Sequence, residues 1–281
     1  MSTEDHDDVK AQTAGPYPGV ALILLAGCSG GGGSSSPPPD DPSSVAPVAG
    51  YWKGAVTDPF SSNLKSATLF AEASGEFQLH ISPLPPNPTG PIFGFGLPFI
   101  IYGIACCEAS ATVSATAKNM DQTLDAPVQL TLDVQPTALT GAFEFEGRRF
   151  TFDLARASID PARLTLNDLA GVYSGSYSSY INTPKGWTLT IQSTGAVTGS
   201  DDYGCNWLGT AAVANTAQNM FRLEVEAEGC GAMQLAPSSG TYTGFGVLSR
   251  NRANPTRYPG QDVIEFNLVG PIWFGQQMLA R

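Results

Sequence analysis

Phe143-Glu-Phe-Glu-Gly-Arg-Arg-Phe-Thr-Phe-Asp-Leu154 is the stretch that decides the fold. Apolar side chains occupy every second position on both sides of Gly147, and this period of two is typical of β-strands with one buried face. Gly147-Arg148 suits a type II′ turn that places Glu146 opposite Arg149. The stretch therefore predicts an antiparallel hairpin. Its expected buried face consists of Phe143, Phe145, Phe150, Phe152 and Leu154.

The same alternation recurs beyond residue 48, in segments 76–81, 128–135, 187–191, 221–227 and 264–268. No segment keeps a period of 3.6 residues, and the best helical candidate is Ser158–Asp168, where Pro161 suits a first turn. Only 14% of the residues are charged, and the chain holds 31 Gly and 22 Pro. This composition favours many short strands joined by turns.

The chain beyond residue 48 repeats itself. Val48–Gly54 parallels Leu169–Gly175, and both halves end on Leu-Ala-Arg. Segments 110–120 and 210–220 agree at six of eleven positions. These matches predict two copies of one unit of about 110 residues.

One spacing in the first copy is longer than its counterpart in the second. Gly75 and Met120 lie 20 residues further apart than Gly195 and Met220, which locates an insertion at residues 82–101. Its sequence is apolar and interrupted by Pro and Gly. It predicts either a loop that binds a partner through Phe93, Phe95, Leu97 and Phe99, or a lid packed over an open barrel end.

Seven or eight antiparallel strands per copy must cover their edges, and closure into a barrel is the simplest solution. We therefore expect an all-β protein with two tandem barrel-like units, at 48–157 and 169–281, joined by a linker at 158–168. A β-sandwich and one larger barrel built from both copies are the alternatives.

The opening segments of the copies, Gly50-Tyr-Trp-Lys-Gly54 and Gly171-Val-Tyr-Ser-Gly175, resemble the first strand of lipocalin-like and avidin-like barrels. Surface lipoproteins related to transferrin-binding protein also carry such barrels. The resemblance implies a second possible function, the carriage of a small apolar ligand inside a barrel.

An apolar run at 19–26 leads into Leu25-Ala-Gly-Cys28. The run is long enough for a secretory signal but too short for a membrane span, which needs about 20 residues. The motif resembles the processing signal of bacterial lipoproteins. This resemblance implies a signal peptide at 1–27, lipidation of Cys28 and, because Ser29 follows, an outer-membrane location.

Residues 28–47 are rich in Gly, Ser and Pro, which predicts a disordered tether rather than the continuation of a core. The lipid bilayer would then be one partner of the chain, bound through acylated Cys28. An envelope or extracellular protein would be the other partner.

Four more cysteines follow Cys28, an even number in an exported chain, so disulfides are the first expectation. Cys205 and Cys230 flank two consecutive predicted strands at the same end, which favours a bridge between them. Cys106 and Cys107 are left as a vicinal disulfide or as two free thiols. Their spacing, without nearby His, disfavours zinc.

The chain offers little for catalysis. After processing, its only histidine is His80, at a polar strand position where a solvated side chain is expected. Asp201-Asp202 lacks the spaced oxygen ligands of a calcium site and indicates a turn. We expect no catalytic residue, metal or cofactor.

Residues 1–27 hold four acids and one base, which leaves 21 acids, 13 bases and a net charge of −8 beyond them. An acidic chain disfavours nucleic-acid binding, because affinity for phosphates depends on clustered Lys and Arg. The sequence thus predicts a non-catalytic envelope lipoprotein that binds a protein partner or has a structural role.

Overall fold

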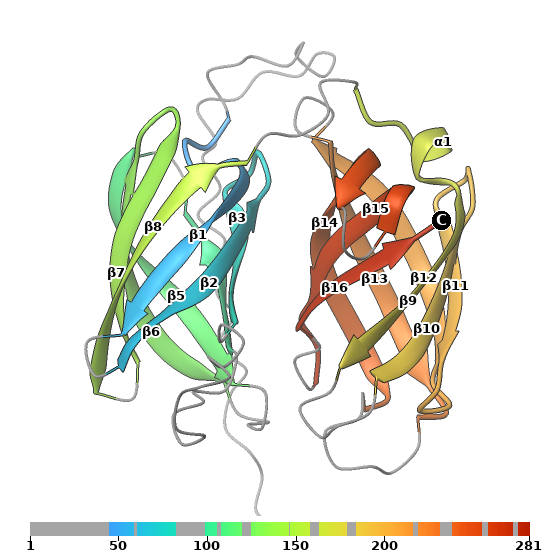
Figure 1. Ribbon diagram of the computed structural model, residues 1–281. Helices are drawn as coiled ribbons and strands as arrows, with labels where there is room; N and C mark the ends of the chain where they lie inside the picture. The colour runs from blue at the N-terminus through green and yellow to red at the C-terminus, as the bar shows by residue number, and fades with distance from the viewer. Residues whose placement is uncertain are drawn as a thin grey trace, which may run out of the picture. The chain divides into compact units, whose positions relative to one another are not determined.

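The computed structural model describes residues 45–58, 61–82, 99–105, 108–119, 125–145, 147–157, 163–178, 184–215, 219–230, 238–254, 258–271 and 275–281. These residues form two closed antiparallel barrels of eight strands each, shown in Figure 1. Both barrels belong to one compact unit, Asp40–Arg281. The prediction of tandem all-β barrels is confirmed, and the sandwich and the single larger barrel are wrong.

The first barrel contains eight strands in chain order. They are β1 (Gly50–Asp58), β2 (Ser61–Ala71), β3 (Glu76–Ser82), β4 (Phe99–Ile104), β5 (Ser110–Asn119), β6 (Ala126–Val134), β7 (Ala138–Phe145) and β8 (Arg148–Arg156). Each strand pairs with the next, and β8 returns to β1 through pairs such as Trp52 with Arg156.

The second barrel repeats this order. Its strands are β9 (Gly171–Ser178), β10 (Pro184–Ile191), β11 (Ala196–Asp201), β12 (Asn206–Asn215), β13 (Met220–Glu228), β14 (Gly240–Asn254), β15 (Tyr258–Leu268) and β16 (Gly275–Ala280). Closure runs through the pairing of Ala280 in β16 with Ser174 in β9. A closed sheet leaves no unpaired edge, which is the physical reason for this architecture.

Alternation along the strands decides what faces the barrel interior. In β6 the buried positions are Val128, Leu130, Leu132 and Val134, and the residues between them are exposed. Each barrel has its own buried apolar core built in this way. The two cores are distinct, because no residue belongs to both.

The hairpin of β7 and β8 exists, but its register differs from the predicted one by two residues. Phe145 pairs with Arg148 and Glu144 with Arg149, so Glu146 is not opposite Arg149. Gly147 has a φ of +72°, a conformation that favours glycine and fixes the turn one position earlier. A shift of two keeps all five predicted apolar side chains inside.

The matched segments of the repeat do not occupy equivalent strands. Segment 110–119 is β5, the fifth strand of its barrel, whereas 210–215 lies in β12, the fourth strand of the other barrel. The sequence agreement therefore does not mark structural equivalence there. Repetition is carried by the strand order and by the Leu-Ala-Arg endings, which close both barrels in the same way.

The predicted insertion at 82–101 is wrong at its ends, because the spacing from Gly75 to Met120 includes three strands, β3 to β5, whereas the spacing from Gly195 to Met220 includes only β11 and β12. Ser82 ends β3, and residues 99–101 belong to β4. Residues 83–98 lie outside the described part of the chain. In the second barrel β11 and β12 are joined by 202–205.

The connection between the barrels contains a helix, α1 (Leu166–Leu169), that is much shorter than the predicted 158–168. Thr165 caps it, because its side chain accepts from the Asp168 backbone N–H while the Asp168 carboxylate accepts from Thr165. Leu164 and Leu169 are buried in the core of the second barrel, so the segment belongs to that barrel.

Candidate functional site

Most of the predicted partner-binding and lipidation residues lie outside the described part of the chain. This holds for Cys28, Phe93, Phe95 and Leu97. Phe99 begins β4, where its backbone pairs with Ile81 and Asn119. The structure describes the strand position of Phe99 but not its side chain.

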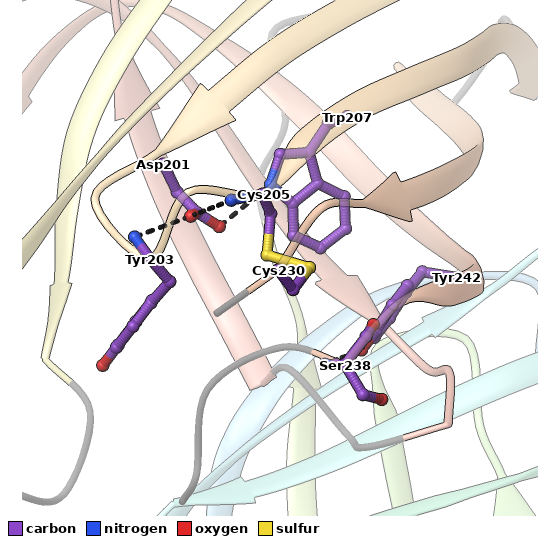
Figure 2. Close-up of a disulfide and its surroundings, with 7 residues drawn as sticks. All are labelled: Asp201, Tyr203, Cys205, Trp207, Cys230, Ser238 and Tyr242. Carbon is purple, nitrogen blue, oxygen red and sulfur yellow. Dashed lines mark hydrogen bonds between the residues drawn. A yellow bond between two sulfur atoms is a disulfide. The ribbon is translucent and has the colours of Figure 1, made fainter. Parts of the chain in front are cut away.

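Cys205 and Cys230 form the predicted disulfide, shown in Figure 2. Their Cα atoms are 4.1 Å apart because Asn206 and Glu228, one and two positions away, are paired across β12 and β13. Cys205 is fully buried. The bond closes one end of the second barrel across 25 residues of sequence.

Asp201 organises the turn beside this disulfide. Its carboxylate accepts from the backbone N–H of Tyr203 at 2.8 Å, from that of Cys205 at 3.1 Å and from the Trp207 indole N–H at 3.0 Å (Figure 2). Burial raises the pKa of Asp201 despite these donors. Asp201 therefore fixes the turn and the position of Cys205.

The neighbouring carboxylate, that of Asp202, binds a different segment. Asp202 accepts from the backbone N–H of Gly186 at 2.6 Å, so it joins the turn to β10. Within the described ranges there is no group of three His, Cys, Asp or Glu residues that could hold a metal ion. The prediction of a structural turn at Asp201-Asp202 is confirmed.

Tyr242 binds the backbone of Ser238 at the same barrel end. Its hydroxyl donates to the Ser238 carbonyl at 2.9 Å and accepts from the Ser238 N–H at 3.1 Å. The ring is fully buried and contacts Trp207 edge to face, with centroids 5.2 Å apart. The disulfide, the Asp201 carboxylate and the Tyr242 hydroxyl thus connect described segments at this barrel end.

Large side chains fill both barrels. Trp52 and Phe77 in the first barrel have no exposed surface, and neither do Tyr173, Trp207 and Phe266 in the second. A ligand-sized cavity would leave exposed surface on the side chains around it. Around these described side chains the interiors therefore have the character of packed cores.

His80 is 3% exposed, which overturns the prediction of a solvated side chain. It points outward from β3, but the outer face of this part of the first barrel is covered. The neighbouring outward residues Thr68 and Gln78 are also buried. Strand alternation alone therefore misassigned the environment of these residues.

The second barrel covers part of this outer face of the first barrel. Tyr51 and Phe70 stack with ring centroids 4.9 Å apart, and they share an apolar cluster with Met220, Phe245 and Val247. All five are outward-facing residues that are at most 4% exposed. We call these five residues the inter-barrel cluster.

Charged groups surround the inter-barrel cluster. Lys53 Nζ lies 2.8 Å from Glu265 Oε2, and Arg222 Nη1 lies 2.7 Å from Glu76 Oε2. The Lys118 ammonium donates to the Gly270 carbonyl at 2.7 Å. Each of these three contacts joins one barrel to the other.

Sequence reasoning missed this surface, although a signal for it existed. Outward and inward apolar residues follow one another in Tyr51-Trp52, Leu69-Phe70 and Phe245-Gly-Val-Leu248. Consecutive apolar residues in a strand indicate that both faces are buried. Their presence in both copies would have predicted contact between outer barrel faces.

No family model, curated protein or solved structure matches this chain. In the described ranges, no helix is long and apolar enough to cross a membrane.

Proposed function

We propose that this chain is a lipid-anchored envelope protein that binds a protein partner through the outer surface of its barrels and performs no catalysis. The observation that carries the proposal is the packing of both barrel interiors, where Trp52, Phe77 and Trp207 have no exposed surface. Packed interiors leave the outer faces and the connections as the available binding surface.

The disulfide supports the export part of the proposal. Cys205 and Cys230 are bonded, with Cys205 buried and Cys230 partly buried, and structural disulfides form in oxidising compartments such as the periplasm or the cell surface. A lipoprotein signal at Leu25–Cys28 accounts for how the chain would reach such a compartment.

The segment we propose for partner binding is 82–101, on the strength of its apolar sequence. An envelope extract is passed over immobilised protein comprising residues 48–281, and bound proteins are cross-linked and identified. A variant with Phe93, Phe95 and Leu97 changed to Ser should lose a partner that the control variant Thr112→Ala retains. Identical partners for both variants would count against this segment.

A ligand carrier remains the second candidate function, favoured by the barrel resemblance alone. Titration of the same protein with a fluorescent fatty acid separates the two. If the protein only binds a protein partner at its surface, it should show no saturable uptake of the fatty acid. Stoichiometric uptake that quenches the fluorescence of Trp207 or Trp52 would favour the carrier.

A further inference from the structure

We infer that the contact between the two barrels is a reversible clasp, which opens without unfolding either barrel and then exposes the inter-barrel cluster. This inference depends only on the described contacts and not on export or lipidation. Each barrel has its own core, and the inter-barrel cluster shares no residue with either. Separation of the barrels would therefore leave both interiors intact.

The clasp contains buried polar groups that lack partners. Asn267 points outward from β15 and is fully buried, and among the residues that the structure describes neither its amide oxygen nor its amide nitrogen has a hydrogen-bond partner. Gln78 donates across the contact to the Thr243 carbonyl at 3.3 Å, but its own buried Oε1 accepts from no group that the structure describes. Unpaired buried amides penalise the closed form, and opening relieves this penalty by hydrating them.

The polar contacts around the cluster differ in exposure. Arg222 and Glu76 are 34% and 35% exposed, and such a pair contributes little to stability. Lys53 is 35% exposed but Glu265 is 1% exposed, so this pair is partly buried. Closure therefore depends on five apolar side chains together with the Lys53–Glu265 and Lys118–Gly270 contacts, and is opposed by the amides of Asn267 and Gln78.

Thiol labelling tests the clasp in the folded protein. In a Cys28→Ser, Cys106→Ser, Cys107→Ser background, Val247→Cys places a thiol in the inter-barrel cluster. Val225→Cys is the matched control, because Val225 is equally buried but lies inside the second barrel. Reaction with N-ethylmaleimide is followed by intact mass under native conditions. Met220→Cys is a second reporter if Val247→Cys fails to fold.

The clasp predicts that the thiol at 247 reacts at least about tenfold faster than the thiol at 225, because opening is easier than unfolding. Adding Asn267→Leu, which replaces the unpaired amide by an apolar group of the same shape, should slow the reaction at 247 about tenfold. The reaction at 225 should not slow in this way. Equal rates at the two positions, or no effect of Asn267→Leu at position 247, would overturn the inference.

Discussion

The guanidinium carbon of Arg156 lies 4.1 Å from the centre of the Trp52 ring, and this contact joins the last residue of β8 to the first strand of the barrel. Arg156 also donates to the Ala49 carbonyl at 3.0 Å. The second barrel repeats the arrangement with Arg281, whose guanidinium carbon lies 5.2 Å from the Tyr173 ring. The shared Leu-Ala-Arg endings thus have one structural role in both copies.

Arg156→Met should destabilise the protein by about 1 to 3 kcal/mol, because it removes the cation–π contact and the hydrogen bond from Arg156 to the Ala49 carbonyl. Urea unfolding measures the loss. Arg149→Met is the control, since Arg149 is exposed on the outer face of β8 and should change stability by less than about 0.5 kcal/mol. Equal effects of the two substitutions would contradict the proposed role of Arg156.

Asp201→Asn should destabilise the second barrel by about 1 to 2 kcal/mol. The amide oxygen can still accept from Tyr203 and Cys205, but the amide nitrogen then meets the Trp207 indole N–H, so two donors face each other. A double-mutant cycle with Trp207→Phe tests this reason. The cost of Asp201→Asn should be smaller in the Trp207→Phe background, and an unchanged cost would rule out the conflict of donors.

Removing the disulfide with Cys205→Ala and Cys230→Ala should lower the free energy of unfolding by about 3 to 4 kcal/mol, as expected for closing a loop of this length. Denaturant titration with and without reductant checks this value. Reductant should destabilise the wild type towards the variant and leave the variant unchanged. If reductant leaves the unfolding midpoint of the wild type unchanged, the disulfide does not stabilise the protein.

The ionised carboxylate of Asp168 should stabilise the protein, and this stabilisation should be lost in acid. The hydrogen bond from the Thr165 hydroxyl, with Arg250 and Arg281 nearby, holds the pKa of Asp168 below its usual value. A lowered folded-state pKa gives stability that is present above the unfolded-state pKa of about 3.9 and is lost as the pH falls through the folded-state value. The melting temperature of wild type should therefore exceed that of Asp168→Asn at pH 7, with a difference that shrinks below about pH 4. A difference that stays constant down to pH 2.5 would contradict the assignment.

Local patterns were sufficient for much of the fold. The period of two in β6 predicted which residues are buried, and strand order placed Cys205 beside Cys230. Hairpin register was not determined by the pattern, because a shift of two keeps Phe143 and Phe150 inside. The register depends on the positive φ of Gly147, which the hydrophobic pattern does not reveal.

The contact between outer barrel faces could not be predicted from strand alternation. Gln78 occupies a polar, outward position in β3, but its partner carbonyl at Thr243 is 165 residues away. Burial of such residues depends on contacts between the barrels. The apolar pair Tyr51-Trp52 was the local sign that both faces of a strand are covered.

The central claim is that Cys28 anchors this two-barrel protein to a membrane. Metabolic labelling with radioactive palmitate in a Gram-negative host tests it most directly, comparing wild type with Cys28→Ala and with the control Cys106→Ser, Cys107→Ser. The account predicts label in wild type and in the control, and none in Cys28→Ala. Absence of label from wild type, or its retention in Cys28→Ala, would contradict the claim.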